Sequence, residues 1–168
     1  MVSKQKNRYL HTWILLGASA LLAACNAERG PCLEPVSAQV NIACRQYIDS
    51  TGSYVDTLLT NANLSALDID SARGWILGAK KVARFSIVLS PLHDTTRWVI
   101  QADSNVSPVD TLTFIYLRKL KFLSNACGYS YTYQLKQVLA TRHSLDSVSI
   151  NSFEVTTKAG TEHVRIYY

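Results

Sequence analysis

The sequence predicts an all-β fold, an immunoglobulin-like β-sandwich of seven to nine strands that follows a cleaved signal peptide. Two observations support this prediction. The chain after residue 24 is rich in Val, Ile, Thr, Tyr and Ser, and most of these residues favour strands. Short segments in which apolar and polar residues alternate recur along the chain and are separated by turn residues. The length after residue 24 suits one domain, which we place at 36–168.

The first 24 residues have the pattern of a secretory signal peptide. No acidic residue precedes Cys25, and the positive charges come first, at Lys4, Lys6 and Arg8. Residues 13–24 are apolar or small, but this run is too short for a membrane-spanning helix, which needs about 20 residues. Leu22-Ala-Ala-Cys25 resembles the bacterial lipobox, whose cysteine is acylated after cleavage. We therefore predict a lipoprotein signal peptide at 1–24, lipidation of Cys25 and a lipidated tether at 25–35.

The charge balance argues against a nucleic acid partner. The whole chain has a formal charge of +5, from 17 basic and 12 acidic residues. Three of the basic residues lie in the predicted signal peptide, so 14 remain after its removal and the formal charge falls to 14 − 12 = +2. A nucleic acid-binding domain is usually strongly basic. Two small basic clusters, Lys80-Lys81-Arg84 and Arg118-Lys119-Lys121, favour solubility and protection of strand edges, with contact to anionic lipid headgroups as the alternative.

Alternating segments predict the strands in chain order. We expect strands at 38–45, 55–59, 85–89, 95–101, 112–116, 129–135, 148–150, 153–155 and 164–166. The segment 95–101 is expected to return on 85–89 as a hairpin across Leu92-His-Asp94. Turns or loops are expected at 49–52, 61–63, 104–108 and 157–160, and a bulge or bend at Asn151-Ser152. Residues 64–79 are interpreted as strand or loop.

Three cysteines remain after Cys25, and in an oxidising compartment we expect two of them to pair. Cys44 lies in the apolar phase of a strand, which indicates a small core residue. Cys32 and Cys127 both lie beside turn residues, so we predict the disulfide Cys32–Cys127. The alternative is Cys44–Cys127, as an inter-sheet bridge of the sandwich. The cysteines and histidines have no ligand-like short spacing, so we predict no metal and no cofactor.

Catalytic patterns are weak. His93-Asp94 and His143 with Asp146 are candidates for a hydrolytic relay, but no nucleophile elbow accompanies them. The glutamates are scattered near the ends of the mature chain and offer no clear glycosidase pair. We therefore predict a protein that is not an enzyme.

A row of three tyrosines is the best candidate for binding. Tyr129, Tyr131 and Tyr133 share one face of one predicted strand, where exposed rings would stack on sugars. The competing interpretation is that this face lies in the core, and Leu135 in the same phase favours it.

Six Asp-Ser or Asp-Thr pairs begin a triplet that resembles the O-glycosylation acceptor of Bacteroidota. Ordinary turn chemistry of Asp and Ser is the competing explanation. The acceptor hydroxyls would belong to Ser50, Thr57, Ser71, Thr95, Thr111 and Ser147.

Several short stretches carry a resemblance to one family. They are Phe122-Leu-Ser-Asn-Ala-Cys-Gly-Tyr129 with Asp110-Thr-Leu and Tyr116 before it, Leu89-Ser-Pro-Leu92 with Asp94-Thr-Thr96, and Cys32 near Pro35. Together they resemble small, uncharacterised lipoproteins of Bacteroidota that carry a domain of unknown function. The resemblance covers most of the chain from Cys32 to Ile166. It implies the localisation and the fold, and it brings no catalytic residues.

The sequence therefore favours a membrane-anchored, non-catalytic β-sandwich that binds a protein or another envelope component close to the membrane. The alternative is a glycan-binding module that uses the tyrosine row with Trp75 or Trp98. Asn26, rather than Asp, follows the lipidated cysteine, which suggests the outer membrane. Only Glu28 is acidic nearby, so a periplasmic face is favoured over the cell surface.

Overall fold

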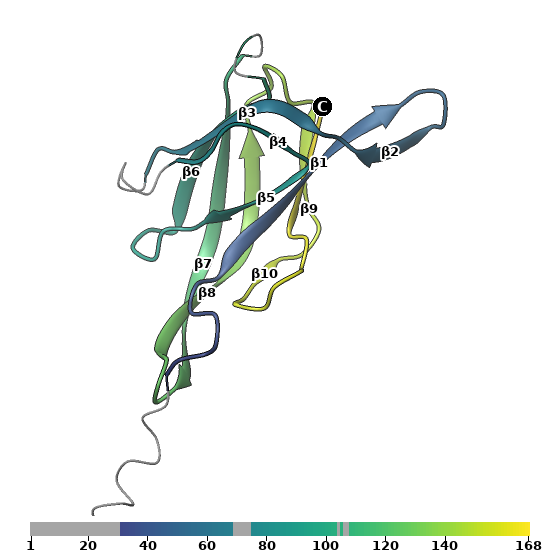
Figure 1. Ribbon diagram of the computed structural model, residues 1–168. Helices are drawn as coiled ribbons and strands as arrows, with labels where there is room; N and C mark the ends of the chain where they lie inside the picture. Colours follow the sequence, from purple (N-terminus) through teal and green to yellow (C-terminus); the bar gives the residue numbers. More distant parts are fainter. Residues whose placement is uncertain (1–30, 69–74, 104, 106–107) are drawn as a thin grey trace, which may run out of the picture. The chain divides into compact units, whose positions relative to one another are not determined.

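The computed structural model describes residues 31–68, 75–103, 105 and 108–168, with the main chain alone for 75–80. The described part is all-β, and its two sheets form a sandwich (Figure 1), which confirms the predicted fold class. The predicted signal peptide and Cys25 lie outside the described residues. The described strands number eleven, more than expected, because the predicted strand at 55–59 is divided between β2 (Ser53–Asp56) and β3 (Leu59–Ala66), and β4 (Trp75–Val82) lies in the stretch interpreted as strand or loop. The short strand β10 (Glu154–Val155) corresponds to the predicted strand at 153–155.

The first sheet has five strands in the order β2-β1-β11-β9, with β5 also paired to β1. Its bounds are β1 (Gln39–Ile48), β5 (Arg84–Val88), β9 (Ser147–Ile150) and β11 (Val164–Tyr167). β1 is the central strand of this sheet. Its first half pairs with β5 and its last residues pair with β2, both antiparallel. Its other edge pairs in parallel with β11, starting with Ile42 opposite Val164.

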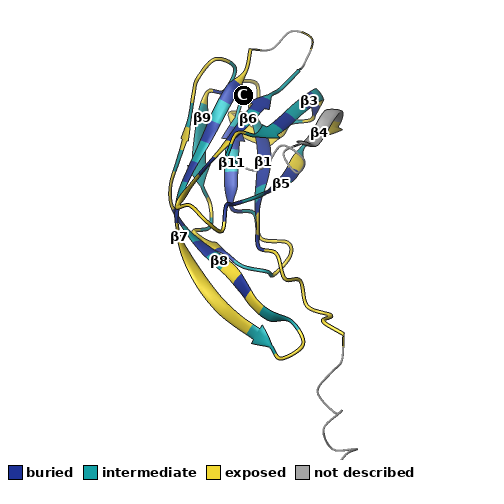
Figure 2. Ribbon diagram, turned by 90° about the vertical axis from the view of Figure 1, so that its left-hand side faces the viewer, coloured by how far each residue is buried: buried dark blue, intermediate teal, exposed yellow. Residues whose placement is uncertain are grey.

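The second sheet has six strands in the order β10-β8-β7-β6-β3-β4. Its remaining bounds are β3 (Leu59–Ala66), β6 (Thr95–Gln101), β7 (Asp110–Ser124) and β8 (Gly128–Ala140). β7 and β8 are by far the longest strands of the described chain. Figure 2 shows that β7 changes from buried to exposed along its length, whereas the buried residues of β8 lie between Ser130 and Leu135.

The chain divides into two compact units. Of the described residues, one unit comprises 31–34 and 123–128, and the other comprises those within 35–122 and 129–168. We call the described residues of the first, 31–34 and 123–128, the tip unit, and the second the sandwich unit. The disulfide Cys32–Cys127 lies within the tip unit and confirms the predicted pairing.

The core of the sandwich unit is formed by alternating residues of both sheets. It includes Val40, Ile42 and Cys44 from β1, Leu112, Phe114 and Tyr116 from β7, and Trp98, Leu135 and Ile166. Cys44 is buried and unpaired, as predicted for a core residue. Burial, followed by the charge of Asp56, raises the pKa of the Cys44 thiol to about 12, so this thiol stays neutral and unreactive at physiological pH.

The predicted hairpin between 85–89 and 95–101 is wrong. β5 pairs with β1, whereas β6 pairs with β3 and β7 in the other sheet. The connection between β5 and β6 passes from one sheet to the other, and hydrogen bonds to side chains, rather than strand pairing, hold it in place. The Ser90 N–H donates to Thr96 Oγ1 at 2.9 Å, and the Leu92 N–H donates to Ser90 Oγ at 3.2 Å. Alternation shows which side chains face inward, but it does not show which sheet a strand joins.

Two further expectations around residue 60 are wrong. The predicted strand at 55–59 is broken, because β2 ends at Asp56 and β3 begins at Leu59. The predicted loop at 61–63 belongs to β3. Asn61 has a φ of 56°, a left-handed conformation that asparagine adopts more readily than most residues, and the pairing of β3 with β4 shifts register around it. The asparagines therefore mark an irregular strand.

The predicted bend at Asn151-Ser152 is where the chain leaves one sheet for the other. β9 pairs with β11 in the first sheet, and β10 pairs with β8 in the second. As a consequence, the turn at 157–160 does not close a hairpin, because it connects β10 to β11 across the two sheets.

Candidate functional site

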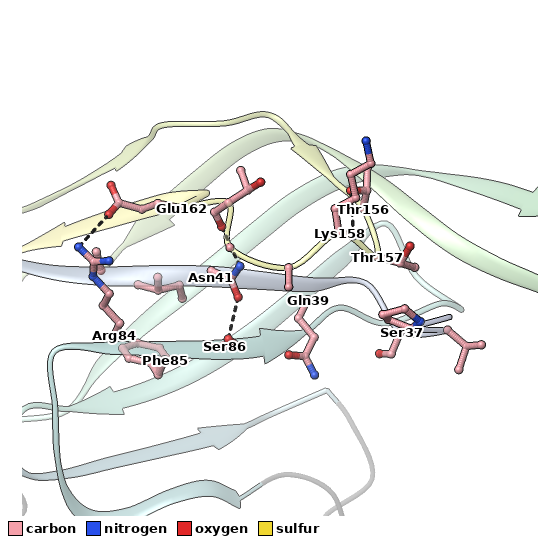
Figure 3. A pocket seen from close by; sticks show the side chains of 17 residues that line it. Ser37, Gln39, Asn41, Arg84, Phe85, Ser86, Thr156, Thr157, Lys158 and Glu162 are labelled. Atoms are coloured by element: carbon pink, nitrogen blue, oxygen red, sulfur yellow. Dashed lines mark hydrogen bonds and ion pairs between the residues drawn. The ribbon is translucent and has the colours of Figure 1, made fainter. Parts of the chain in front are cut away.

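A groove of about 660 Å³ lies beside β1 and is the leading candidate site (Figure 3). We call it the β1 groove. β1 contributes Gln39 and Asn41, β5 contributes Arg84 and Ser86, and the loop Thr156–Glu162 forms the facing wall. Its size falls within the usual range for ligand pockets, about 300–1,000 Å³. No pattern in the sequence indicated this groove, because none of its polar residues forms a recognisable motif.

Hydrogen bonds hold the floor of the β1 groove in place. Ser86 Oγ donates to Asn41 Oδ1 at 2.7 Å, and Asn41 Nδ2 donates to the Thr161 carbonyl at 2.7 Å. The amide of Asn41 therefore links β5, β1 and the loop, as the dashed lines in Figure 3 show in part. A floor fixed in this way loses little conformational entropy when a ligand binds.

The buried ring of His163 continues this arrangement under the loop. Its Nδ1 accepts the Asn41 N–H at 3.0 Å, and its own main-chain N–H donates to the Asn41 carbonyl at 2.9 Å. Burial lowers the pKa of His163, and a hydrogen bond with the main chain of Glu154 opposes part of that effect. The ring is therefore neutral at pH 7 and holds β1 in place.

The main chain of β1 presents hydrogen-bonding groups to the groove. Both main-chain groups of Asn41 bond His163, so they point away from β5. In an antiparallel pair this direction recurs every second residue, which places the N–H and C=O of Gln39 on the same edge. Pairing with β11 starts only at Ile42. Within the described chain no hydrogen bond to the main chain of Gln39 occurs on this edge, so the edge is open there.

One end of the β1 groove is positively charged. Arg45 pairs with Asp56 and, at 3.3 Å, with Glu162. Arg84 lies 3.0 Å from Asp56, and Arg165 lies 2.5 Å from Glu162. Three guanidinium groups thus share two carboxylates, which leaves one positive charge at this end. The groove suits a ligand that carries an acidic group.

The predicted tyrosine row is split by the fold. Tyr129 is 65% exposed, Tyr131 37% and Tyr133 only 7%. Tyr133 packs edge-on against Tyr116 at 5.2 Å and donates its hydroxyl to the Leu89 carbonyl at 3.3 Å. Trp98 is completely buried and donates to the Val88 carbonyl. The side chain of Trp75 lies outside the described residues. No flat aromatic platform is formed by the three tyrosines.

Two of these tyrosines border a second groove, of about 740 Å³. Tyr131 and Tyr133 line it together with the segment Val88–His93, residues 36–38 before β1, Asp68 and Ser130. Ser130 Oγ donates to the Val36 carbonyl at 2.6 Å and holds one rim. We call this the tyrosine groove.

The histidine candidates do not form a catalytic relay. His143 Nδ1 lies 3.2 Å from Asp110 Oδ1, and Ser144 Oγ donates to Asp110 Oδ2 at 2.7 Å. Both side chains thus bond the same carboxylate, whereas a relay needs the histidine between the serine and the acid. The expected partner Asp146 is not involved. Asp94, beside His93, pairs with Arg118 at 2.6 Å.

Asp110 is the most buried acidic side chain among the described residues, and the sequence pattern did not indicate its structural role. Its carboxylate accepts hydrogen bonds from three main-chain N–H groups, those of His143, Ser144 and Leu145, and from the hydroxyls of Thr141 and Ser144. Burial alone would raise the pKa of Asp110, but the hydrogen bonds from His143, Ser144 and Thr141 outweigh it and bring the pKa well below its usual range. The carboxylate anchors the loop between β8 and β9.

The predicted O-glycosylation sites differ in exposure. Ser50 and Thr95 are exposed, whereas Thr57, Thr111 and Ser147 are partly buried, and Ser71 lies outside the described residues. Three of the preceding aspartates already have structural partners. Asp56 and Asp94 bind arginines, and Asp110 anchors a loop. Ser50 and Thr95 are therefore the sites that an enzyme would reach in the folded chain.

Over the described residues, no group of three or more His, Cys, Asp or Glu side chains is placed to hold a metal ion. That same part of the chain contains no helix with the length and apolarity to cross a membrane.

Comparison with models of protein families gives a match. Residues 51–168, more than two thirds of the chain, match the model of DUF6452, a family of unknown function. Comparison with curated proteins and with solved structures gave no match. The match begins within the β1–β2 turn and contains the β1 groove's facing loop, the tyrosine groove's aromatic residues and Asp110. The chain belongs to DUF6452, a family of unknown function.

Proposed function

We propose that this protein is a lipid-anchored, non-catalytic module of the bacterial cell envelope that binds an extended segment of another envelope protein in the β1 groove. The lipobox-like Leu22-Ala-Ala-Cys25 supports acylation of Cys25. The proposed setting is the outer membrane of a member of the Bacteroidota, on its periplasmic face. The tether of 25–35 keeps the ligand close to the membrane.

The open edge of β1 at Gln39 is the observation that carries the proposal. An extended peptide adds to such an edge through its own main-chain hydrogen bonds, and neighbouring pockets then select its side chains. Here the fixed amide of Asn41 lies next to the open position. The surplus positive charge of the arginine cluster favours a peptide with an acidic side chain or a terminal carboxylate.

A photo-crosslinking experiment in intact envelopes tests this proposal. A photoreactive amino acid at Gln39 should give one stoichiometric adduct with an envelope protein. The same amino acid at Thr60, which is exposed in β3 of the other sheet, is the matched control and should give none. Equal adducts from both positions, or none from Gln39, would contradict the proposal.

Two substitutions at the same residue test the mode of binding. Gln39→Pro removes the main-chain N–H that faces the groove, whereas Gln39→Ala removes only the side chain. Because that N–H does not pair with β5, both variants should fold with similar melting temperatures. The adduct, detected from a second photoreactive position at Ser37, should fall at least several-fold for Gln39→Pro and persist for Gln39→Ala. Equal yields would rule out strand addition.

Acylation is tested separately. Metabolic labelling with a clickable fatty acid should mark the wild type and not Cys25→Ser, and equal labelling of both would refute the anchor.

The tyrosine groove supports a second candidate, a glycan-binding module. Tyr131 remains partly accessible at its rim, and sugars stack on such rings while nearby polar groups orient them. Titration with a glycan panel should change the intrinsic fluorescence of the wild type but not of Tyr131→Ala. The control is Tyr54→Ala, an exposed tyrosine in β2 that does not line the tyrosine groove. This result, combined with no adduct from Gln39, would replace the peptide proposal.

A further inference from the structure

The charged residues of the β7–β8 hairpin and of the loop that follows it are almost all basic. Between Thr111 and Leu145 the sequence has no acidic residue. The same stretch carries five basic residues, Arg118, Lys119, Lys121, Lys136 and Arg142. This stretch therefore has a formal charge of +5.

Part of the same hairpin is apolar and uncovered. In the sandwich unit, Leu120 is 60% exposed, Phe122 51% and Tyr129 65%. The rings of Phe122 and Tyr129 contact each other edge-on at 5.2 Å, so these two residues share one face. We call the segments 117–122 and 129–131 the outer hairpin. Its exposed apolar and aromatic residues are contiguous, unlike the scattered single residues that are normal on a surface.

Two lysines of the outer hairpin are available to bind anions. Arg118 is occupied by Asp94 and by the Pro91 carbonyl. Lys119 and Lys121 form no ion pair with any described residue. They alternate with Leu120 and Phe122 along β7. The long apolar stems of the two lysines let their ammonium groups reach a layer of anionic groups while Leu120 and Phe122 are buried in an adjacent apolar layer.

A short covalent path joins this hairpin to the predicted lipid. From Cys25 to Cys32 the chain has 32 − 25 = 7 residue steps, which span at most about 25 Å when extended. The disulfide then connects Cys32 to Cys127 with a Cα–Cα distance of 4.8 Å, and Tyr129 is two residues further. The disulfide therefore bypasses the chain between these cysteines, which lie 95 positions apart in sequence.

We infer that the outer hairpin lies in the headgroup layer of the bilayer that holds the acyl chains of Cys25. Phe122, Leu120 and Tyr129 supply the apolar and aromatic contacts typical of a membrane interface. Lys119 and Lys121 bind the phosphates of anionic lipids. The disulfide serves as a staple that keeps the hairpin within reach of the membrane. This inference rests on the proposed anchoring at Cys25.

Depth-dependent quenching tests the inference with the full acylated protein in proteoliposomes of phosphatidylethanolamine and phosphatidylglycerol. An environment-sensitive fluorescent amino acid replaces Phe122 in one sample. In the matched control it replaces Tyr54, an equally exposed aromatic residue of β2. Brominated lipids should quench the probe at Phe122 at least three-fold more than the probe at Tyr54. Equal quenching at the two positions, or none at Phe122, overturns the inference.

Charge reversal tests the role of the lysines. Lys119→Glu with Lys121→Glu should reduce the quenching at Phe122 in vesicles that contain phosphatidylglycerol. The same change should have little effect in pure phosphatidylcholine, and an equal loss in both lipids contradicts a headgroup role. Crosslinking of Phe122 to a protein rather than to lipid would also overturn the inference. Fatty-acid labelling of the same samples separates the two claims: labelled Cys25 without quenching leaves the anchor intact, whereas unlabelled Cys25 removes both.

Discussion

The two halves of β7 have the same alternating sequence and different surroundings. Phe114 is completely buried in the core, whereas Phe122, in the same phase of the same strand, is 51% exposed. Figure 2 shows this change along β7. The inner half belongs to the core cluster with Trp98 and Ile166. Alternation therefore specifies a strand and its two faces, but burial depends on what covers a face. We interpret the inner half as a folding element and the outer half as a contact surface.

The largest loss of stability is expected from a substitution in the inner half of β7. Phe114→Ala removes a buried ring from the core, and such changes lower the free energy of unfolding by about 3–5 kcal/mol. Urea unfolding followed by the fluorescence of the buried Trp98 measures it. A loss under 1 kcal/mol would show that the inner half is not packed as described.

Asp110, where β7 begins, should be nearly as sensitive. Asp110→Ala leaves three main-chain N–H groups of the β8–β9 loop without their acceptor, and we expect a loss of about 3 kcal/mol. The pH dependence gives a second check. The folded pKa of Asp110 is depressed below the unfolded value of about 3.9, so its contribution is complete above that value and is lost as the pH falls below it.

The difference in unfolding free energy between wild type and Asp110→Asn should therefore be constant from about pH 5 to pH 7 and shrink below about pH 4. A difference that grows as the pH falls would contradict the assignment of Asp110 as a stabilising anion.

The disulfide should contribute somewhat less. Cys127→Ser opens the crosslink to Cys32, and the loss of a native disulfide typically costs about 2–4 kcal/mol. The matched control is Cys44→Val, a similar-sized change at the buried unpaired cysteine, which should cost less than about 1.5 kcal/mol. If both variants lose the same free energy of unfolding, the disulfide contributes no more to stability than the packing of one cysteine side chain.

Much of the inner half of β7 could be predicted from the sequence, but much of the β1 groove could not. The alternation of Leu112, Phe114 and Tyr116 indicated the strand and its inward face, and the turn residues around Cys32 and Cys127 indicated their disulfide. The passage of the chain from β5 in one sheet to β6 in the other could not be found in this way, because it is held by the main chain of Ser90 and the hydroxyls of Thr96 and Tyr116, which meet only in the fold. The β1 groove was missed for the same reason: Asn41, Ser86 and Thr161 are far apart in sequence and show no pattern.

The hydroxyl cluster gives a smaller expected effect. The Ser90 N–H donates to Thr96 Oγ1, the Thr96 and Tyr116 hydroxyls lie 2.6 Å apart, and the Tyr116 hydroxyl donates to the Ser90 carbonyl at 2.9 Å. Tyr116→Phe breaks this ring of hydrogen bonds without leaving a large cavity. We expect a loss of about 1–2 kcal/mol in thermal or urea unfolding, and the control Tyr129→Phe, at an exposed hydroxyl, should change stability by less than about 0.5 kcal/mol.

The smallest expected change in stability is the most direct test of the contrast within β7. Urea unfolding of Phe122→Ala, measured beside Phe114→Ala, compares the same substitution at the two ends of one strand. If the outer half is a contact surface, Phe122→Ala should change the free energy of unfolding by no more than about 0.5 kcal/mol. A loss of about 2 kcal/mol or more would show that Phe122 packs as a core residue and that the outer hairpin is not free to contact a membrane.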